Sequence, residues 1–127
     1  MNDHSRILLV SRDQLLLQTR KLILGAFFEV ETAARLSEAG YVLSQHDFDL
    51  IVLCDTLSNA DCEQIADMVH DRKPKPTLLS LLGPYAENRD RQVGRKVALT
   101  GGPLQLIREC ADVLGFDLHG KQRSLSN

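Results

Sequence analysis

Short apolar runs alternate with amphipathic segments along the chain. The runs have the length of buried strands, and they predict strands at residues 7–10, 28–33, 50–54, 77–82 and 96–99. Apolar residues at helical spacing predict helices at residues 14–25, 35–44, 59–71 and 103–115. The interval 85–95, between the last two strands, is polar and only weakly patterned.

Alternating strands and helices with short connections are typical of a doubly wound α/β domain. Such a domain has a parallel sheet covered by helices on both faces. Ligands bind there outside the carboxyl ends of the strands. In this chain those ends are residues 11–13, 54–56, 80–82 and 99–101, so we expect a functional site among them.

Size and charge narrow the classes of function. The 127 residues suit one domain, which we place at residues 1–117, with a polar and disordered tail at 118–127. The chain contains 15 Lys and Arg and 17 Asp and Glu, so its net charge is −2. We therefore expect neither nucleic acid nor a membrane as partner. The polar start and short first apolar run do not fit a signal peptide, which favours the cytoplasm.

Cysteine usage indicates free thiols. The chain has three cysteines, an odd number that does not fit a disulfide framework. Their spacing matches no zinc template, so we expect no metal site.

Three segments carry a resemblance to a known family: residues 6–10, 29–33 and 47–53, which read RILLV, EVETA and DFDLIVL. Their sequence and order resemble receiver domains of bacterial two-component response regulators over residues 5–116. The resemblance implies a CheY-like, flavodoxin-like sheet of five parallel strands in the order 2-1-3-4-5 with five helices. It also implies a role in signal transduction.

In that family, a carboxylate at the end of the third strand accepts a phosphoryl group, and an acidic pair after the first strand holds Mg²⁺. Here Ser11 and Arg12 stand at the acidic pair, and only the next residue, Asp13, is acidic. Cys54 stands at the acceptor position, with Asp55 one step later. Because adjacent strand residues point to opposite faces, we expect Asp55 to reach the site only if the strand end bulges.

The family's two other signature groups are also altered. The hydroxyl after the fourth strand is matched by Ser80, or by Leu81 if the alignment is anchored on Pro76. The family's lysine falls near Leu99, where this chain has none. Phosphoryl transfer depends on positioned charge, so we expect Mg²⁺ binding to be lost and no cofactor to be used. The chain resembles a degenerate receiver, or pseudo-receiver.

Two side chains near this site have alternative roles. Arg12 could replace Mg²⁺ electrostatically by pairing with Asp13 or Asp55, or it could be a solvated residue at a helix start. Cys54 could be a reactive thiol if Arg12 lowered its pKa, or a small apolar filler in the core. We favour the filler.

Two of the predicted helices carry apolar residues on more than one side. On the first helix, Leu17 and Leu24 either mark a contact surface or pack on the sheet as part of a wide apolar face, which we favour. On the last helix, Leu106, Cys110 and Val113 form a second stripe. The resemblance implies that this stripe belongs to a docking or dimer face.

Our first hypothesis is a stand-alone signalling domain that is not an enzyme. It would bind a protein partner, such as a histidine kinase or another signalling protein, or a second copy of itself, without phosphorylation. The alternative is a regulator that is still phosphorylated or switched by a ligand at a displaced site around Asp55 and Asp13. An enzyme with Cys54 as nucleophile would lack a base, because no histidine falls at the strand ends.

Overall fold

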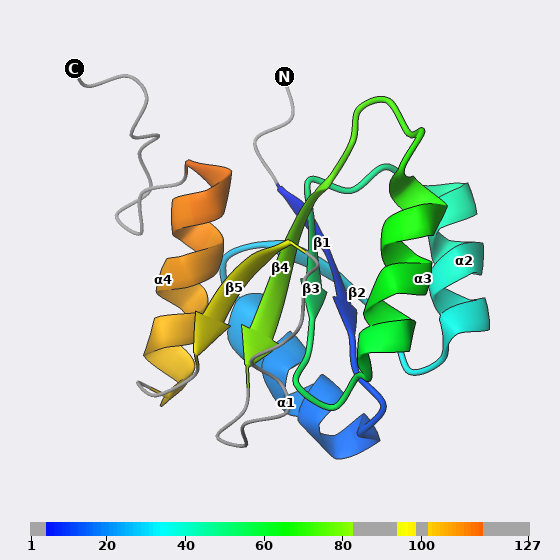
Figure 1. Cartoon of the computed structure of the whole chain (residues 1–127). Coiled ribbons are helices and arrows are strands. Elements are labelled where there is room, and N and C mark those ends of the chain that lie inside the picture. The colour runs from blue at the N-terminus through cyan, green and yellow to red at the C-terminus, as the bar shows by residue number, and fades with distance from the viewer. Residues whose placement is uncertain (1–4, 83–93, 99–101, 116–127) are drawn as a thin grey trace.

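A five-stranded parallel sheet forms the centre of the molecule, in a computed structural model that describes residues 5–82, 94–98 and 102–115 (Figure 1). Neighbouring strands lie in the order β2-β1-β3-β4-β5, and every paired neighbour is parallel. The order expected from the receiver resemblance is therefore confirmed. The strands are β1 (Arg6–Val10), β2 (Glu29–Ala33), β3 (Leu50–Leu53), β4 (Thr77–Leu82) and β5 (Arg95–Ala98).

Helices cover both faces of this sheet (Figure 1). One face packs against α1 (Gln14–Leu24) and α4 (Gly102–Leu114), and the other against α2 (Leu36–Gln45) and α3 (Asn59–Val69). The described part of the chain thus has the four helices predicted from apolar spacing, whereas the receiver resemblance implied five. The fifth would fall between β4 and β5, where residues 83–93 lie outside the described part. None of the described helices has the length and apolarity that a membrane span needs.

Local sequence signals explain where several elements begin. The Asp13 carboxylate accepts hydrogen bonds from two backbone N–H groups in the first turn of α1, which an N-cap residue is expected to do. Ser58 and Asp61 form a capping box at the start of α3. Gly94 precedes β5 with a φ of 73°, and a Cβ there would lie 2.5 Å from the carbonyl oxygen of Leu78, so only glycine fits.

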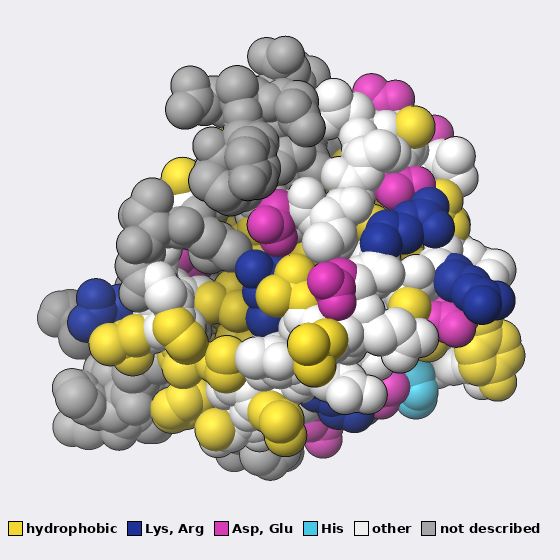
Figure 2. Space-filling view, turned by 90° about the horizontal axis from the view of Figure 1, so that it is seen from below, with side chains coloured by type: hydrophobic (Ala, Val, Ile, Leu, Met, Phe, Trp, Pro, Cys, Tyr) yellow, Lys and Arg dark blue, Asp and Glu magenta, His cyan; other side chains and the backbone are white. Residues whose placement is uncertain are grey.

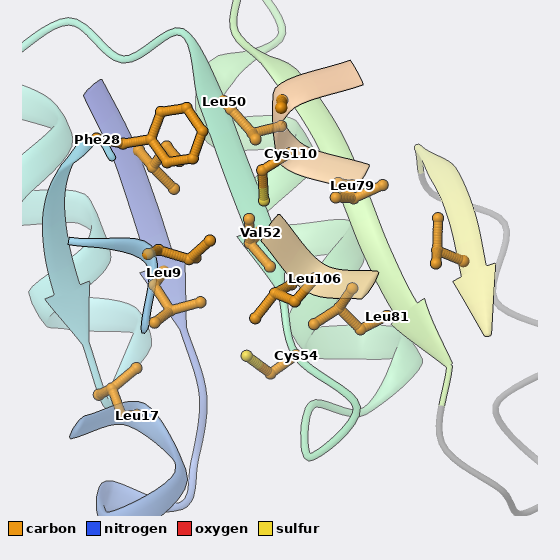
Figure 3. Close-up of a cluster of buried hydrophobic side chains, with 14 residues drawn as sticks. Leu9, Leu17, Phe28, Leu50, Val52, Cys54, Leu79, Leu81, Leu106 and Cys110 are labelled. Carbon is orange, nitrogen blue, oxygen red and sulfur yellow. The ribbon is translucent and has the colours of Figure 1, made fainter. Parts of the chain in front are cut away.

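The core has two layers, one on each side of the sheet. β1 and β3 lie in the middle, and their residues 7–10 and 50–53 are at most 1% exposed. Figure 3 shows the layer between the sheet and helices α1 and α4, with Leu17, Cys54 and Leu106 among its side chains. The second layer lies under α2 and α3.

The orientation of α1 differs from the stripe that first suggested a helix. Helical spacing also groups Leu15, Leu16, Thr19, Leu22 and Ile23 into an apolar stripe, but Leu15 and Leu22 are 75% and 80% exposed. Leu17 and Leu24 instead pack on the sheet and are 5% and 0% exposed. The interpretation that these two residues face the sheet is confirmed, and the helix presents its other apolar side to solvent.

The second stripe of α4 is likewise buried. Leu106 is 3% exposed and Cys110 is fully buried, and both belong to the core layer that Figure 3 shows. Val113 is half-buried and packs against the same layer. The docking surface expected from these three residues is wrong for Leu106 and Cys110, because α4 turns them toward the sheet. The domain end at residue 117 and the tail at 118–127 lie outside the described residues.

Candidate functional site at the carboxyl ends of the strands

Ser11 joins the loop after β1 to the loop after β3. Its side chain is fully buried, and its Oγ lies 2.9 Å from the Oγ1 of Thr56. The same Thr56 oxygen accepts a hydrogen bond from the backbone N–H of Arg12, and the Ser11 Oγ accepts one from the N–H of Asp13. At the first position of the family's acidic pair, this chain therefore has a hydroxyl committed to fixing two loops.

Arg12, at the second position of the acidic pair, forms a bidentate ion pair with Asp61 of α3. The Nη2–Oδ1 distance is 2.7 Å and the Nε–Oδ2 distance is 3.1 Å. Two parallel N–H···O bonds between charged groups are strong and directional. Of the two alternatives for Arg12, pairing with Asp13 or Asp55 is wrong, because its partner is Asp61, whose carboxylate the capping box at the start of α3 also holds.

The electrostatics of Asp61 follow from these contacts. Hydrogen bonding by the Arg12 guanidinium lowers the pKa of Asp61 below its usual value, partial burial opposes this effect, and the N–H of Ser58 adds to the lowering. The same pair raises the pKa of Arg12. The carboxylate is therefore charged at neutral pH and holds α3 to the loop after β1.

The side chain of Asp13 caps the N-terminus of α1. Its Oδ1 accepts hydrogen bonds from the N–H groups of Leu15 and Leu16, at 3.0 and 3.1 Å. These N–H groups have no partner within the helix, so the carboxylate stabilises the positive end of α1.

Asp55 pairs with a residue that the sequence did not single out, Arg20 of α1. The Nη1–Oδ1 distance is 3.1 Å, and the two side chains are 12% and 22% exposed. The sequence predicted that Asp55 would reach the site only if the end of the third strand bulged. Instead, β3 ends at Leu53 and a turn follows, closed by the Leu57 N–H donating to the carbonyl of Cys54. The alternation of strand side chains therefore stops before Asp55.

Arg20 could have been found from the face of α1 on which it lies. It stands three residues after Leu17 and four before Leu24, so it shares the side that faces the sheet. Burial lowers the pKa of Arg20, but Cys54 and Asp55 together raise it. A basic residue on the buried side of a helix indicates a buried partner, and this signal required knowing which side is buried.

Cys54, at the phosphoacceptor position, has a fully buried side chain in the layer under α1 and α4 (Figure 3). Burial raises the pKa of its thiol to about 11, although the nearby Arg20 opposes the shift. The condition for a reactive thiol was a lowered pKa next to Arg12. The neighbouring cation is Arg20 instead, and the thiol is protonated at neutral pH.

The register of β4 decides between Ser80 and Leu81. Ser80 pairs with Leu53, whose side chain lies in the layer under α2 and α3. Leu81 lies in the other layer, together with Cys54 (Figure 3). The residue beside Cys54 is therefore an apolar leucine, and the hydroxyl of Ser80 belongs to the opposite face of the sheet. Leu99, at the expected lysine position, lies outside the described residues.

The donor groups at this edge do not fit the Mg²⁺ site of the receiver family. Mg²⁺ requires carboxylate and other oxygen ligands that are free to coordinate. Here the carboxylates of Asp13, Asp55 and Asp61 are engaged by a helix terminus, Arg20 and Arg12. Across residues 5–82, 94–98 and 102–115, no three His, Cys, Asp or Glu side chains gather into a possible metal site.

Comparison with solved structures identifies the architecture. A CheY-like receiver domain protein from Methanospirillum hungatei superposes with a TM-score of 0.69 at 21% identity, covering 88% of this chain and 94% of that one. A receiver protein from Burkholderia phymatum gives 0.73 at 14% identity, covering 89% and 97%. The chain has the receiver fold.

The likeness is one of fold and not of close sequence. An orphan response regulator of H. pylori also superposes on the receiver fold of this chain, with a TM-score of 0.65 at 14% identity, covering 87% and 96%. No protein-family model matches the sequence, and no curated protein matches it significantly. Any function therefore has to be argued from the residues of the site.

Proposed function

We propose that this chain is a pseudo-receiver: a signalling domain of the receiver fold that works without phosphorylation and acts by binding another protein. One observation carries the proposal. At the edge where receivers place a metal cage and an acceptor, Arg12 and Arg20 are paired with Asp61 and Asp55, and a buried thiol stands at the acceptor position.

The chemistry of phosphoryl transfer supports this assignment. The protein supplies mainly positioned charge around the transferred group, in particular the metal and its carboxylates. Ser11 and Arg12 stand where the family has two acidic metal ligands. In place of two negative charges, this chain therefore has a hydrogen-bonded hydroxyl and a positively charged side chain. The protonated, buried thiol of Cys54 is a poor substitute for an acceptor carboxylate. In this proposal the domain is not an enzyme and needs no Mg²⁺.

The proposed output is affinity for a protein partner in the cytoplasm, such as a histidine kinase or another signalling protein. The net charge of −2 supports a protein over nucleic acid or an anionic membrane. With the edge held by internal ion pairs, the partner would meet one conformation of the loops after β1 and β3, whatever the supply of phosphodonor.

The decisive experiment is intact-mass spectrometry after incubation with Mg²⁺ and acetyl phosphate. We expect the mass to stay unchanged under conditions in which an ordinary receiver gains one phosphoryl group. The variants Asp55→Asn, Asp13→Asn and Cys54→Ser are run in parallel. An adduct that disappears in Asp55→Asn or Asp13→Asn would overturn the proposal and identify a displaced acceptor, and one that disappears only in Cys54→Ser would reveal thiol chemistry.

A further inference from the structure

A cavity of about 260 Å³ opens between α1 and α4. Its walls are mostly apolar, with Leu16, Ile23, Pro103 and Leu106 among the lining residues. Leu106 is 3% exposed and Pro103 is exposed, so the cavity reaches from the core layer to the surface. Figure 2 shows the molecule from this side, with hydrophobic side chains gathered at the lower left, over α1 and α4. A hollow lined mainly by apolar side chains, with a few polar groups, is the usual form of a small-molecule site.

The charged residue of this cavity is Arg20, whose side chain is 12% exposed. Its guanidinium contacts Asp55 and Cys54. Figure 3 shows Cys54 next to Leu106, in the same core cluster, so the positive charge lies at the buried end of the cavity. A guanidinium has five N–H donors. Within the described part of the chain, Nη1 bonds to Asp55 and the group also contacts Cys54, which leaves donors for a further anion.

The other walls of the cavity also favour a negative charge. None of the residues that line it is acidic. Gly102 and Pro103, the first residues of α4, belong to the lining, and the first turn of a helix carries the positive end of its dipole. An uncharged apolar occupant would cover the remaining donors of Arg20 without pairing them, which is unfavourable. The cavity is therefore complementary to a ligand that has an apolar body and one anionic end.

We propose that this cavity binds a small carboxylic acid, whose carboxylate accepts hydrogen bonds from Arg20 and whose apolar body packs against Leu16, Ile23 and Leu106. A planar guanidinium matches a carboxylate in shape and charge. Because an apolar cavity of about 150 Å³ holds benzene, the larger volume here suits an aromatic or medium-chain acid of about ten non-hydrogen atoms. Arg20 keeps its bond to Asp55 in the complex, so binding requires no movement of the loop after β3.

Titration with phenylacetate and with hexanoate, followed by ¹H–¹⁵N NMR, tests the proposal without a phosphodonor or a protein partner. We expect a dissociation constant below about 1 mM for at least one of them, with shifts at Arg20, Ile23 and Leu106 and none at Tyr41 on α2. Phenylacetamide, which is neutral, and acetate, which lacks the apolar body, should bind at least about tenfold more weakly. The proposal is overturned if neither acid binds, if the amide binds as tightly as phenylacetate, or if the shifts lie elsewhere.

Charge substitutions test the role of the guanidinium. Arg20→Met should weaken binding at least about tenfold, because it removes the hydrogen bonds to the carboxylate. Asp55→Asn should strengthen binding by about threefold or more, because it removes a negative charge that competes for the same guanidinium. Arg95→Met is the matched control: it removes an arginine that pairs with Asp112 outside the cavity, and binding should not change. Circular dichroism checks that each variant is folded. Wild-type affinity in Arg20→Met, or weaker binding in Asp55→Asn, overturns the proposal.

A change of cavity volume gives an independent measurement. Leu16→Trp places a larger side chain in the wall of the cavity, so it should weaken binding of phenylacetate at least about fivefold by occupying the space of the ligand. Leu15→Trp is the matched control, because the neighbouring Leu15 is 75% exposed and does not line the cavity. We expect this variant to bind like the wild type. Equal affinity in the two tryptophan variants would contradict binding in the cavity.

Discussion

The ion pair between Arg20 and Asp55 should be one of the main polar stabilisers of the domain. Exposed ion pairs contribute about 0–1 kcal/mol, whereas removing one partner of a buried pair costs about 3–5 kcal/mol. The two side chains here are 12% and 22% exposed, which places them between these limits. We expect Asp55→Asn to lower the free energy of unfolding by about 2 kcal/mol.

The loss of stability in each variant arises from the charged partner that remains unpaired. In Asp55→Asn the guanidinium of Arg20 keeps its charge in a site with little access to water, close to Cys54. In Arg20→Met the length and the apolar contacts of the side chain are retained, and the remaining carboxylate is the more hydrated of the two partners. We therefore expect a smaller loss, about 1 kcal/mol, for Arg20→Met. The double variant should cost less than the sum of the single ones by about 1–2 kcal/mol.

Urea unfolding followed by circular dichroism measures all four members of this double-mutant cycle. For a domain of this size, a loss of 2 kcal/mol also corresponds to a fall of about 8 °C in Tm. The pair Arg95–Asp112 is the matched control: its distance of 3.2 Å is similar, but its side chains are 48% and 46% exposed. We expect its coupling to stay below about 0.5 kcal/mol. Additive single variants at Arg20 and Asp55 would refute the reasoning.

Three further predictions follow from burial and charge. Because Arg12 holds the pKa of Asp61 below its ordinary 3.8, the contribution of their ion pair to stability is complete above about pH 4. The stability difference between wild type and Asp61→Asn should shrink as the pH falls from about 4 toward the lowered pKa of Asp61, and a difference that does not change in acid would contradict this. Leu17→Ala should lower the free energy of unfolding in urea by about 3 kcal/mol, whereas Leu15→Ala, on the exposed side, should lower it by less than about 0.5 kcal/mol. All three cysteines are buried, so they should resist a thiol reagent at neutral pH and react after unfolding in guanidinium. Rapid modification of Cys54 in the native state would contradict the conclusion that its thiol is protonated and inaccessible.

The fold was predictable because its signals are local and repeated. Each apolar run of the sequence became a strand within two residues of the expected ends, and the alternation with helices determined a parallel sheet. Pairing order came from the family resemblance, and the register confirms it. Strand length and helix spacing depend on neighbours within one or two turns, which a single sequence contains in full.

The orientation of α1 was harder to predict because the helix is apolar on two sides. Leu15 and Leu22 lie on one side and Leu17 and Leu24 on the other, so spacing alone does not choose between them. The choice depends on tertiary packing: Leu17 and Leu24 contact the core layer of the sheet, and Arg20, on the same side, contacts Asp55, which is 35 positions away in sequence. Contacts between residues so far apart in sequence are not visible in the spacing of the leucines.

The charge pairs of the site were beyond sequence reasoning for the same reason. The partner of Arg12 is 49 positions away, and it is set by the packing of α3 beside the loop after β1. The sequence correctly directed attention to the residues that replace the acidic pair and the acceptor. It could not assign them partners, because several acidic residues lay within the reach of a flexible arginine.

In the proposed pseudo-receiver, internal ion pairs would take the place of a ligand, and the domain would then have no means of switching. A ligand shifts a conformational equilibrium only by its difference in affinity for the two states. Arg12–Asp61 and Arg20–Asp55 belong to the chain itself, so under this proposal they would favour the same loop conformation whether or not a phosphodonor is present. The response of such a domain would then be set by its own concentration and that of its partner.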